Sequence, residues 1–294
     1  MKKINFFLVG VLLVNLLGCF SCKEHLSHSI PQTTHKVIPL NGEETAQLTS
    51  SLYKELGPRI GVHLVDPNVV IALAGLRGGG SITLHGLTDE EKLKLKKVNE
   101  NFQKFGIKFV VHEDVKDEIA VISVLNLKGF EYASRLSKFP FMKPFDSSTG
   151  FEGLEGWQNE MYSEVKKYFK DKKYTKKRPL GDTLGHFFGG LMLGYPDQAL
   201  LDFLADYTTN SSRSKLSYHS IPYSDYYENA QPNFGYFREH ENEESIVRTR
   251  KSWGNLLKRF YTSSLYKSLA KDPMFIQTRD SEDDAHHEWF KRKR

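Results

Sequence analysis

The sequence predicts an α+β protein in which a mixed α/β part, residues 40–145, is followed by a helix-rich part, residues 146–294. Apolar runs of strand length lie between turn residues in the first part. From Gly150 onward, apolar residues recur at helical spacing instead. The chain is 39% hydrophobic and 13% aromatic, which is typical of a packed globular body. The residues leave open whether the two parts are separate domains or share one core.

Capping residues mark the helices of the first part. Asn41 is followed by Glu44, and Thr88 is followed by Glu91. In this pattern each side chain satisfies a free amide group at the start of a helix. The predicted helices of this part cover residues 41–56, 88–105 and 130–139.

Strand-length apolar runs supply about four or five strands of the first part. The run at 118–125 is almost wholly apolar, so we expect it at the centre of the sheet. The glycine-rich stretch 75–81 lacks the Gly-Lys-Ser/Thr of a phosphate loop and is interpreted as a flexible connection, with an anion cradle as the alternative. The predicted strands are 60–65, 69–74, 81–85, 107–112 and 118–125.

The second part reads as four helices and a long aromatic loop, residues 217–237. Carboxylates and histidines at 280–288 are metal-ligating types. We expect a flexible terminal tail there, which would not orient them, so no metal site is predicted. The basic residues 291–294 are interpreted as a frayed end. The predicted helices are 154–170, 179–193, 196–207 and 241–269.

The N-terminus has the features of a signal peptide. Lys2 and Lys3 precede an apolar run over 6–18, which is shorter than the roughly 20 residues needed to cross a bilayer. The order Leu16-Leu17-Gly18-Cys19 resembles the lipobox of bacterial lipoproteins. The resemblance covers only the first nineteen or so residues. It implies export, removal of residues 1–18, and attachment of a diacylglycerol to the thiol of Cys19.

This resemblance predicts a cell-envelope protein held to a membrane by its lipid, on the periplasmic or the cell-surface side. Residues 19–39 would form the anchor and a flexible linker. The alternatives are a signal that anchors the chain uncleaved, a plain secretory signal, a redox pair of Cys19 with Cys22, and a structural zinc site. A redox pair requires a strand–helix setting, and zinc requires two further ligands nearby, so both are disfavoured.

Composition excludes several function classes. A formal charge of +5 is too mild for a nucleic-acid binder, so we expect no specific nucleic-acid binding. Both cysteines lie in the N-terminal segment, so the body has no cysteine nucleophile. No cofactor motif is present, and we predict no cofactor. The sequence does not settle whether the protein is an enzyme, nor its oligomeric state.

One candidate site residue, His186, lies on a predicted helix that has glycines every four residues. Gly181, Gly185 and Gly189 lie on one stripe of this helix, and such glycines serve close helix packing or leave backbone open to a ligand. Packing is the favoured interpretation. If a ligand binds here, His186 could act as a general base.

Two further segments are candidate binding sites. The loop 217–237 mixes aromatic rings with hydrogen-bonding groups, as sugar or peptide grooves do. Its candidate ligand residues are Tyr218, Tyr223, Asp225, Tyr226 and Tyr227, with His219 as a second candidate acid or base. The segment 166–178 is strongly basic and could bind an anionic surface or polymer. Its candidate residues are Lys172, Lys173, Lys176, Lys177 and Arg178.

Three hypotheses follow. The first is a non-catalytic, lipid-anchored binding or envelope-interaction protein. The second is an envelope-polymer hydrolase that uses His186 or His219. The third is an adhesin-like protein that binds anionic surfaces through 166–178.

Overall fold

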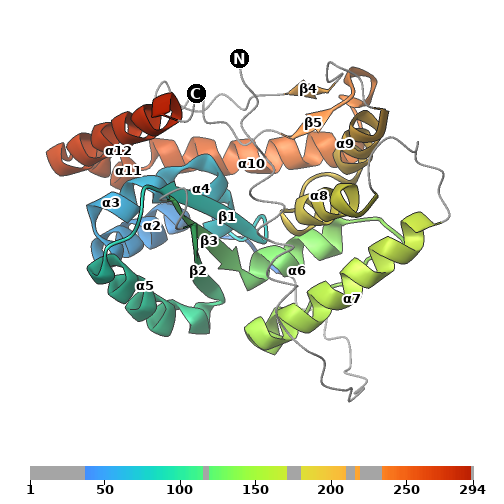
Figure 1. Cartoon of the computed structure of the whole chain (residues 1–294), viewed down its shortest axis with the longest axis horizontal. Coiled ribbons are helices and arrows are strands. Elements are labelled where there is room, and N and C mark those ends of the chain that lie inside the picture. Colours follow the sequence, from blue (N-terminus) through green and yellow to red (C-terminus); the bar gives the residue numbers. More distant parts are fainter. Residues whose placement is uncertain (1–36, 115–118, 171–179, 210–215, 219–233, 293–294) are drawn as a thin grey trace.

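The computed structural model describes residues 37–114, 119–170, 180–209, 216–218 and 234–292 (Figure 1). It confirms the α+β class: the main sheet lies in the N-terminal half, and helices make up most of the described remainder.

The main sheet has three antiparallel strands in the order β1-β3-β2. They are β1 (Gly79–Leu84), β2 (Ile107–Asp114) and β3 (Ile119–Asn126). Ser123 of β3 faces Ser81 on one side and Val110 on the other. The nearly apolar run is therefore the central strand, as predicted.

The capped helices of the first part are also confirmed. α2 (Gly42–Leu56) and α5 (Asp89–Phe102) each begin with a complete capping box. The 3₁₀ turn η2 (Gln103–Phe105) follows α5 and ends at Gly106, which has a left-handed conformation. A third helix, α6 (Leu127–Leu136), follows β3 directly.

The strands predicted at 60–65 and 69–74 are wrong, because both runs are helical. The segment forms α3 (Pro58–Gly61), the 3₁₀ turn η1 (Val62–Val65) and α4 (Pro67–Leu73). Both α-helices start with proline, and the carboxylate of Asp66 accepts the Asn68 amide at the start of α4. Every residue of 69–74 is buried, and a short run that is apolar on all sides does not distinguish a strand from a helix. The described residues of 40–145 thus hold three strands rather than four or five.

The second half is built from helices with a two-stranded pair, β4 (Ser217–Tyr218) and β5 (Gly235–Tyr236). The helix predicted at 241–269 is interrupted, because the Ser263 hydroxyl accepts the Tyr266 amide and starts a new helix. The predicted flexible tail at 280–288 is wrong, since it belongs to the last helix. The remaining elements are η3 (Ser147–Thr149), α7 (Gly150–Lys170), α8 (Leu180–Met192), α9 (Asp197–Thr209), η4 (Arg238–His240), α10 (Glu244–Thr262), α11 (Ser264–Leu269) and α12 (Pro273–Arg292).

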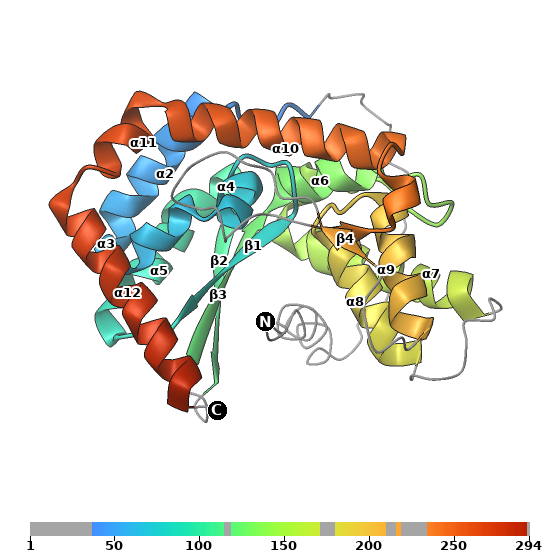
Figure 2. The ribbon, with the colours of Figure 1, turned by 90° about the horizontal axis from the view of Figure 1, so that it is seen from above.

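The helix α10 packs against both halves of the molecule. Figure 2 shows this helix running along one side of the molecule, from α9 at one end to α11 at the other. It packs against α2 and α4 of the first half and against α9 of the second. One buried apolar cluster accordingly contains Val70 and Ile71 together with Ala199, Trp253 and Phe260.

The glycine-rich stretch 75–81 is buried rather than a flexible connection. A Cβ at Gly78 would overlap the ring of Phe130, and one at Gly80 would lie 2.9 Å from the carbonyl oxygen of Asn68. These glycines let the start of β1 lie against α6 and α4.

Within the described ranges, none of the helices combines the length and the apolar character needed to cross a membrane.

Candidate functional site

Most residues singled out from the sequence lie outside the described residues. Of the others, Tyr218 belongs to β4, where it pairs with Gly235. His186 lies on α8, with its ring edge-on to Phe203 of α9 at 6.2 Å between centroids. Those outside are Cys19, His219, Tyr223, Asp225, Tyr226, Tyr227, Lys172, Lys173, Lys176, Lys177 and Arg178.

Two glycines at the C-terminal end of the glycine-rich helix serve close packing. A Cβ at Gly190 would overlap the side chain of Leu200 on α9. Gly194 has a φ of +72°, and its Cβ would come within 3.3 Å of Ala133 on α6. These contacts bring α8, α9 and α6 together around the turn that carries Tyr195.

A hollow of about 20 Å³ lies between the end of α6, the α8–α9 turn and the first half of α10. That volume holds about one water-sized group. Its walls are partly aromatic, and two of its side chains carry opposite charges. The lining residues that matter here are Tyr132, Tyr195, Asp197, Arg248 and Trp253.

Arg248 has more hydrogen-bond donors than partners. Its Nε is buried and has no partner. One Nη donates to the carbonyl oxygen of Leu136 at a long 3.4 Å, and the other lies 3.5 Å from the exposed carboxylate of Glu244. A guanidinium carries five N–H donors, so this one can accept a further anionic partner.

Asp197 is a weaker candidate for binding a ligand because its carboxylate already has partners. It begins α9 and accepts the backbone amide of Lys138 at 2.5 Å. Burial raises the pKa of Asp197, while the hydrogen bonds from Lys138 and Ser137 and the charge of Arg248 oppose that rise. Burial likewise raises the pKa of Tyr132.

A second arginine, Arg77, lies behind two aromatic walls of the hollow. It is 3% exposed, and its guanidinium carbon lies 5.5 Å from the ring centre of Tyr195 and 5.6 Å from that of Trp253. One Nη donates to Asn68 at 2.7 Å, and its buried Nε has no partner. Burial lowers the pKa of Arg77, opposed by Tyr195 and Asp66.

Asp202 and His240 form a separate polar pair between α9 and η4. The carboxylate is 2% exposed, and its oxygens lie 2.8 and 2.9 Å from Nδ1 of the imidazole. Gln198 Nε2 donates to one oxygen at 2.9 Å, and the amide of Phe237 donates to the other at 2.8 Å. The His240 side chain is 31% exposed. A buried carboxylate therefore orients an imidazole that reaches the surface.

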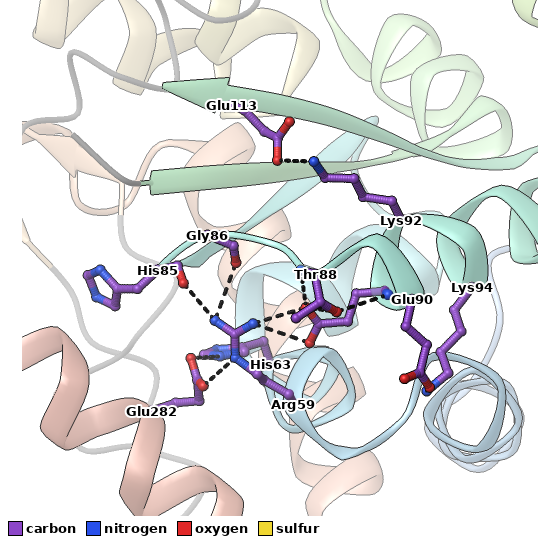
Figure 3. A network of polar contacts seen from close by, with 11 residues as sticks. Arg59, His63, His85, Gly86, Thr88, Glu90, Lys92, Lys94, Glu113 and Glu282 are labelled. Atoms are coloured by element: carbon purple, nitrogen blue, oxygen red, sulfur yellow. Dashed lines mark hydrogen bonds and ion pairs between the residues drawn. The ribbon is translucent and has the colours of Figure 1, made fainter. Parts of the chain in front are cut away.

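A network of ion pairs and hydrogen bonds around Arg59 joins α3, α5 and α12 (Figure 3). Its Nε donates to Glu282 at 2.8 Å, and Nη1 donates to both oxygens of Glu91 at 3.0 and 3.2 Å. Nη2 donates to the carbonyl oxygens of His85 and Gly86. Hydrogen bonds and charge from Arg59 and His63 lower the pKa of Glu282 against the opposing effect of burial. Because the guanidinium of Arg59 is fully used within the fold, this network is a structural clamp.

Sequence reasoning missed the residues of these clusters. For Arg77 the sequence gives one indication, because this cation lies among glycines and apolar residues. The sequence gives no such indication for Arg248, Asp202 or His240, because their partners come from distant segments. Among the described residues, no three histidine, cysteine or acidic side chains are grouped to hold a metal ion.

Comparison of the chain with protein-family models, with curated proteins and with solved structures gave no match.

Proposed function

We propose that the protein is an exported lipoprotein, anchored to a membrane of the cell envelope through Cys19, that binds a small carboxylate ligand in the hollow beside Arg248. The order Leu16-Leu17-Gly18-Cys19 supports the anchor. The observation that carries the binding function is Arg248, which lines the hollow and whose buried Nε has no partner.

The small volume of the hollow favours the binding of one end of a ligand, rather than of a whole ligand. A volume of about 20 Å³ admits one small group. A carboxylate would accept hydrogen bonds from Arg248, and charge-assisted bonds of this kind are the strong ones. Tyr132 and Tyr195, which are only partly buried, would contact the part of the ligand that extends out of the hollow beside the carboxylate, which favours a flat apolar group there.

Binding is tested by calorimetric titration of the full chain in detergent with benzoate and with benzamide. We expect the wild type to bind benzoate and not the neutral amide. Arg248→Gln should weaken benzoate binding at least about tenfold, because a hydrogen bond to a charged group contributes about 1.5–3 kcal/mol.

The matched control is Arg250→Gln. Arg250 lies on the same helix, outside the hollow, and its closest carboxylate is that of Glu241 at 4.0 Å. It should bind benzoate as the wild type does. Equal binding of benzamide, or equal losses in the two variants, would contradict the proposal.

The anchor is tested by the mass of the N-terminal peptide of protein isolated from its native host. We expect a peptide that begins at Cys19 and carries a diacylglycerol. In Cys19→Ala this peptide should be missing, and the protein should leave the membrane fraction. An unmodified N-terminus that still includes residues 1–18 would exclude the lipoprotein assignment.

A further inference from the structure

The Asp202–His240 pair has the arrangement that an acid–base catalyst requires. An ionised carboxylate only accepts hydrogen bonds, so the proton between the two groups belongs to Nδ1 of His240. In the neutral imidazole, the other ring nitrogen, Nε2, then carries a lone pair that can take a proton. In hydrolases an aspartate holds the catalytic histidine in this tautomer and stabilises the imidazolium that forms.

The surroundings keep the carboxylate fixed. Gln198 comes from the same helix as Asp202, one turn earlier, and Phe237 comes from the segment that carries His240. These two donors and Nδ1 hold both oxygens in place, which leaves the imidazole as the exposed member of the pair.

We propose that Asp202 and His240 are an acid–base dyad that hydrolyses carboxylic esters with water as the nucleophile. Nε2 of His240 takes a proton from water while the water oxygen bonds to the ester carbonyl carbon. The bond from that carbon to the alcohol oxygen then breaks, and the leaving oxygen receives the proton from Nε2. Ester and water are consumed, and a carboxylic acid and an alcohol are formed.

The choice of an ester rests on the proposed carboxylate site. Asp197 and Ser245 line the hollow. Asp197 directly precedes Gln198, which donates to Asp202, and Ser245 follows His240 by five positions in the chain. Each member of the dyad is thus joined through a few residues to the wall of the hollow, where a product carboxylate would bind. The acid–base role itself rests only on the geometry of the pair.

The test is hydrolysis of p-nitrophenyl acetate by the full chain in detergent. We expect His240→Gln to lower kcat/KM at least about 100-fold, because general acid–base groups contribute about 10²–10⁴ in rate. Asp202→Asn should also lower it, because asparagine cannot stabilise the imidazolium as a carboxylate does. The matched control is His112→Gln, another partly buried histidine, on β2, which should hydrolyse the ester as the wild type does.

A chemical rescue separates catalysis from structure. In His240→Ala, added imidazole should restore part of the activity, while the melting temperature of the variant should not change on its addition. Wild-type hydrolysis no faster than that of His240→Gln would overturn the proposal, as would a loss in His240→Ala that imidazole does not relieve. Suppose that Arg248→Gln abolishes benzoate binding but leaves ester hydrolysis unchanged. That result would support the catalytic role of Asp202 and His240 and would exclude a role of the hollow in the reaction.

Discussion

Gly129→Ala is expected to lower the free energy of unfolding by at least about 3 kcal/mol, the upper end for overpacking in a core. The added Cβ would overlap the carbonyl group of Arg77 and lie within 3.0 Å of the backbone nitrogen of Gly78. Neither backbone group can move easily, because Gly78 is itself packed against Phe130 and the carbonyl oxygen of Met192. Denaturant unfolding followed by circular dichroism measures the difference.

The control is Gly156→Ala on the exposed face of α7. A Cβ at Gly156 meets nothing within 4 Å, and its φ is not positive. Alanine should therefore stabilise the helix by up to about 1 kcal/mol. Opposite signs for two identical substitutions would establish that packing, rather than helix propensity, decides the effect at Gly129. A neutral Gly129→Ala would show that α6 does not pack this closely on the start of β1.

Arg59→Met is expected to destabilise the protein by about 2 kcal/mol or more, since it leaves Glu91 and Glu282 without their main cation. Both carboxylates are largely covered, with side chains 11% and 12% exposed. Lys92→Met, which removes an ion pair with Glu113 whose side chains are 43% and 40% exposed, should cost clearly less, because solvent screens such exposed pairs. Equal losses in the two variants would mean that the clamp is no stronger than a surface pair.

The pH dependence of the clamp has a definite sign. The pKa of Glu282 is lowered from 4.5 in the folded protein. The group therefore contributes stability above pH 4.5 and loses that contribution as the pH falls through its folded pKa. The difference in unfolding free energy between wild type and Glu282→Gln should be present at neutral pH and shrink toward zero in acid. A difference that grew on acidification would contradict the assignment.

Local signals predicted those elements that local interactions determine. The capping boxes at Asn41 and Thr88 identify their helices because the capping bonds join residues three apart. The run over 118–125 is correctly predicted at the sheet centre, because a strand that is almost wholly apolar must be covered on both faces. The strand predictions for 60–65 and 69–74 are wrong, because full burial removes the apolar periodicity that distinguishes a helix from a strand.

The polar clusters could not be predicted from the sequence. Asp202 lies 38 residues from His240, and Arg59 lies 223 residues from Glu282. No spacing rule connects such partners, since the packing of whole helices brings them together. The last helix was predicted as a tail for the same reason. Its position depends on Phe275 packing against Tyr53 of α2 and on Glu282 binding Arg59, and both partners come from the first sixty residues.

The position of α10 and α12 against the first half affects when the chain can fold. The hydroxyl of Tyr261 donates to the carbonyl oxygen of Val65, 196 residues earlier. A growing chain therefore carries an uncovered α2–α4 surface until α10 and α12 have left the ribosome. Contacts between residues so far apart slow folding. We expect the core of the first half to stay incomplete in the nascent chain until these two helices have been synthesised.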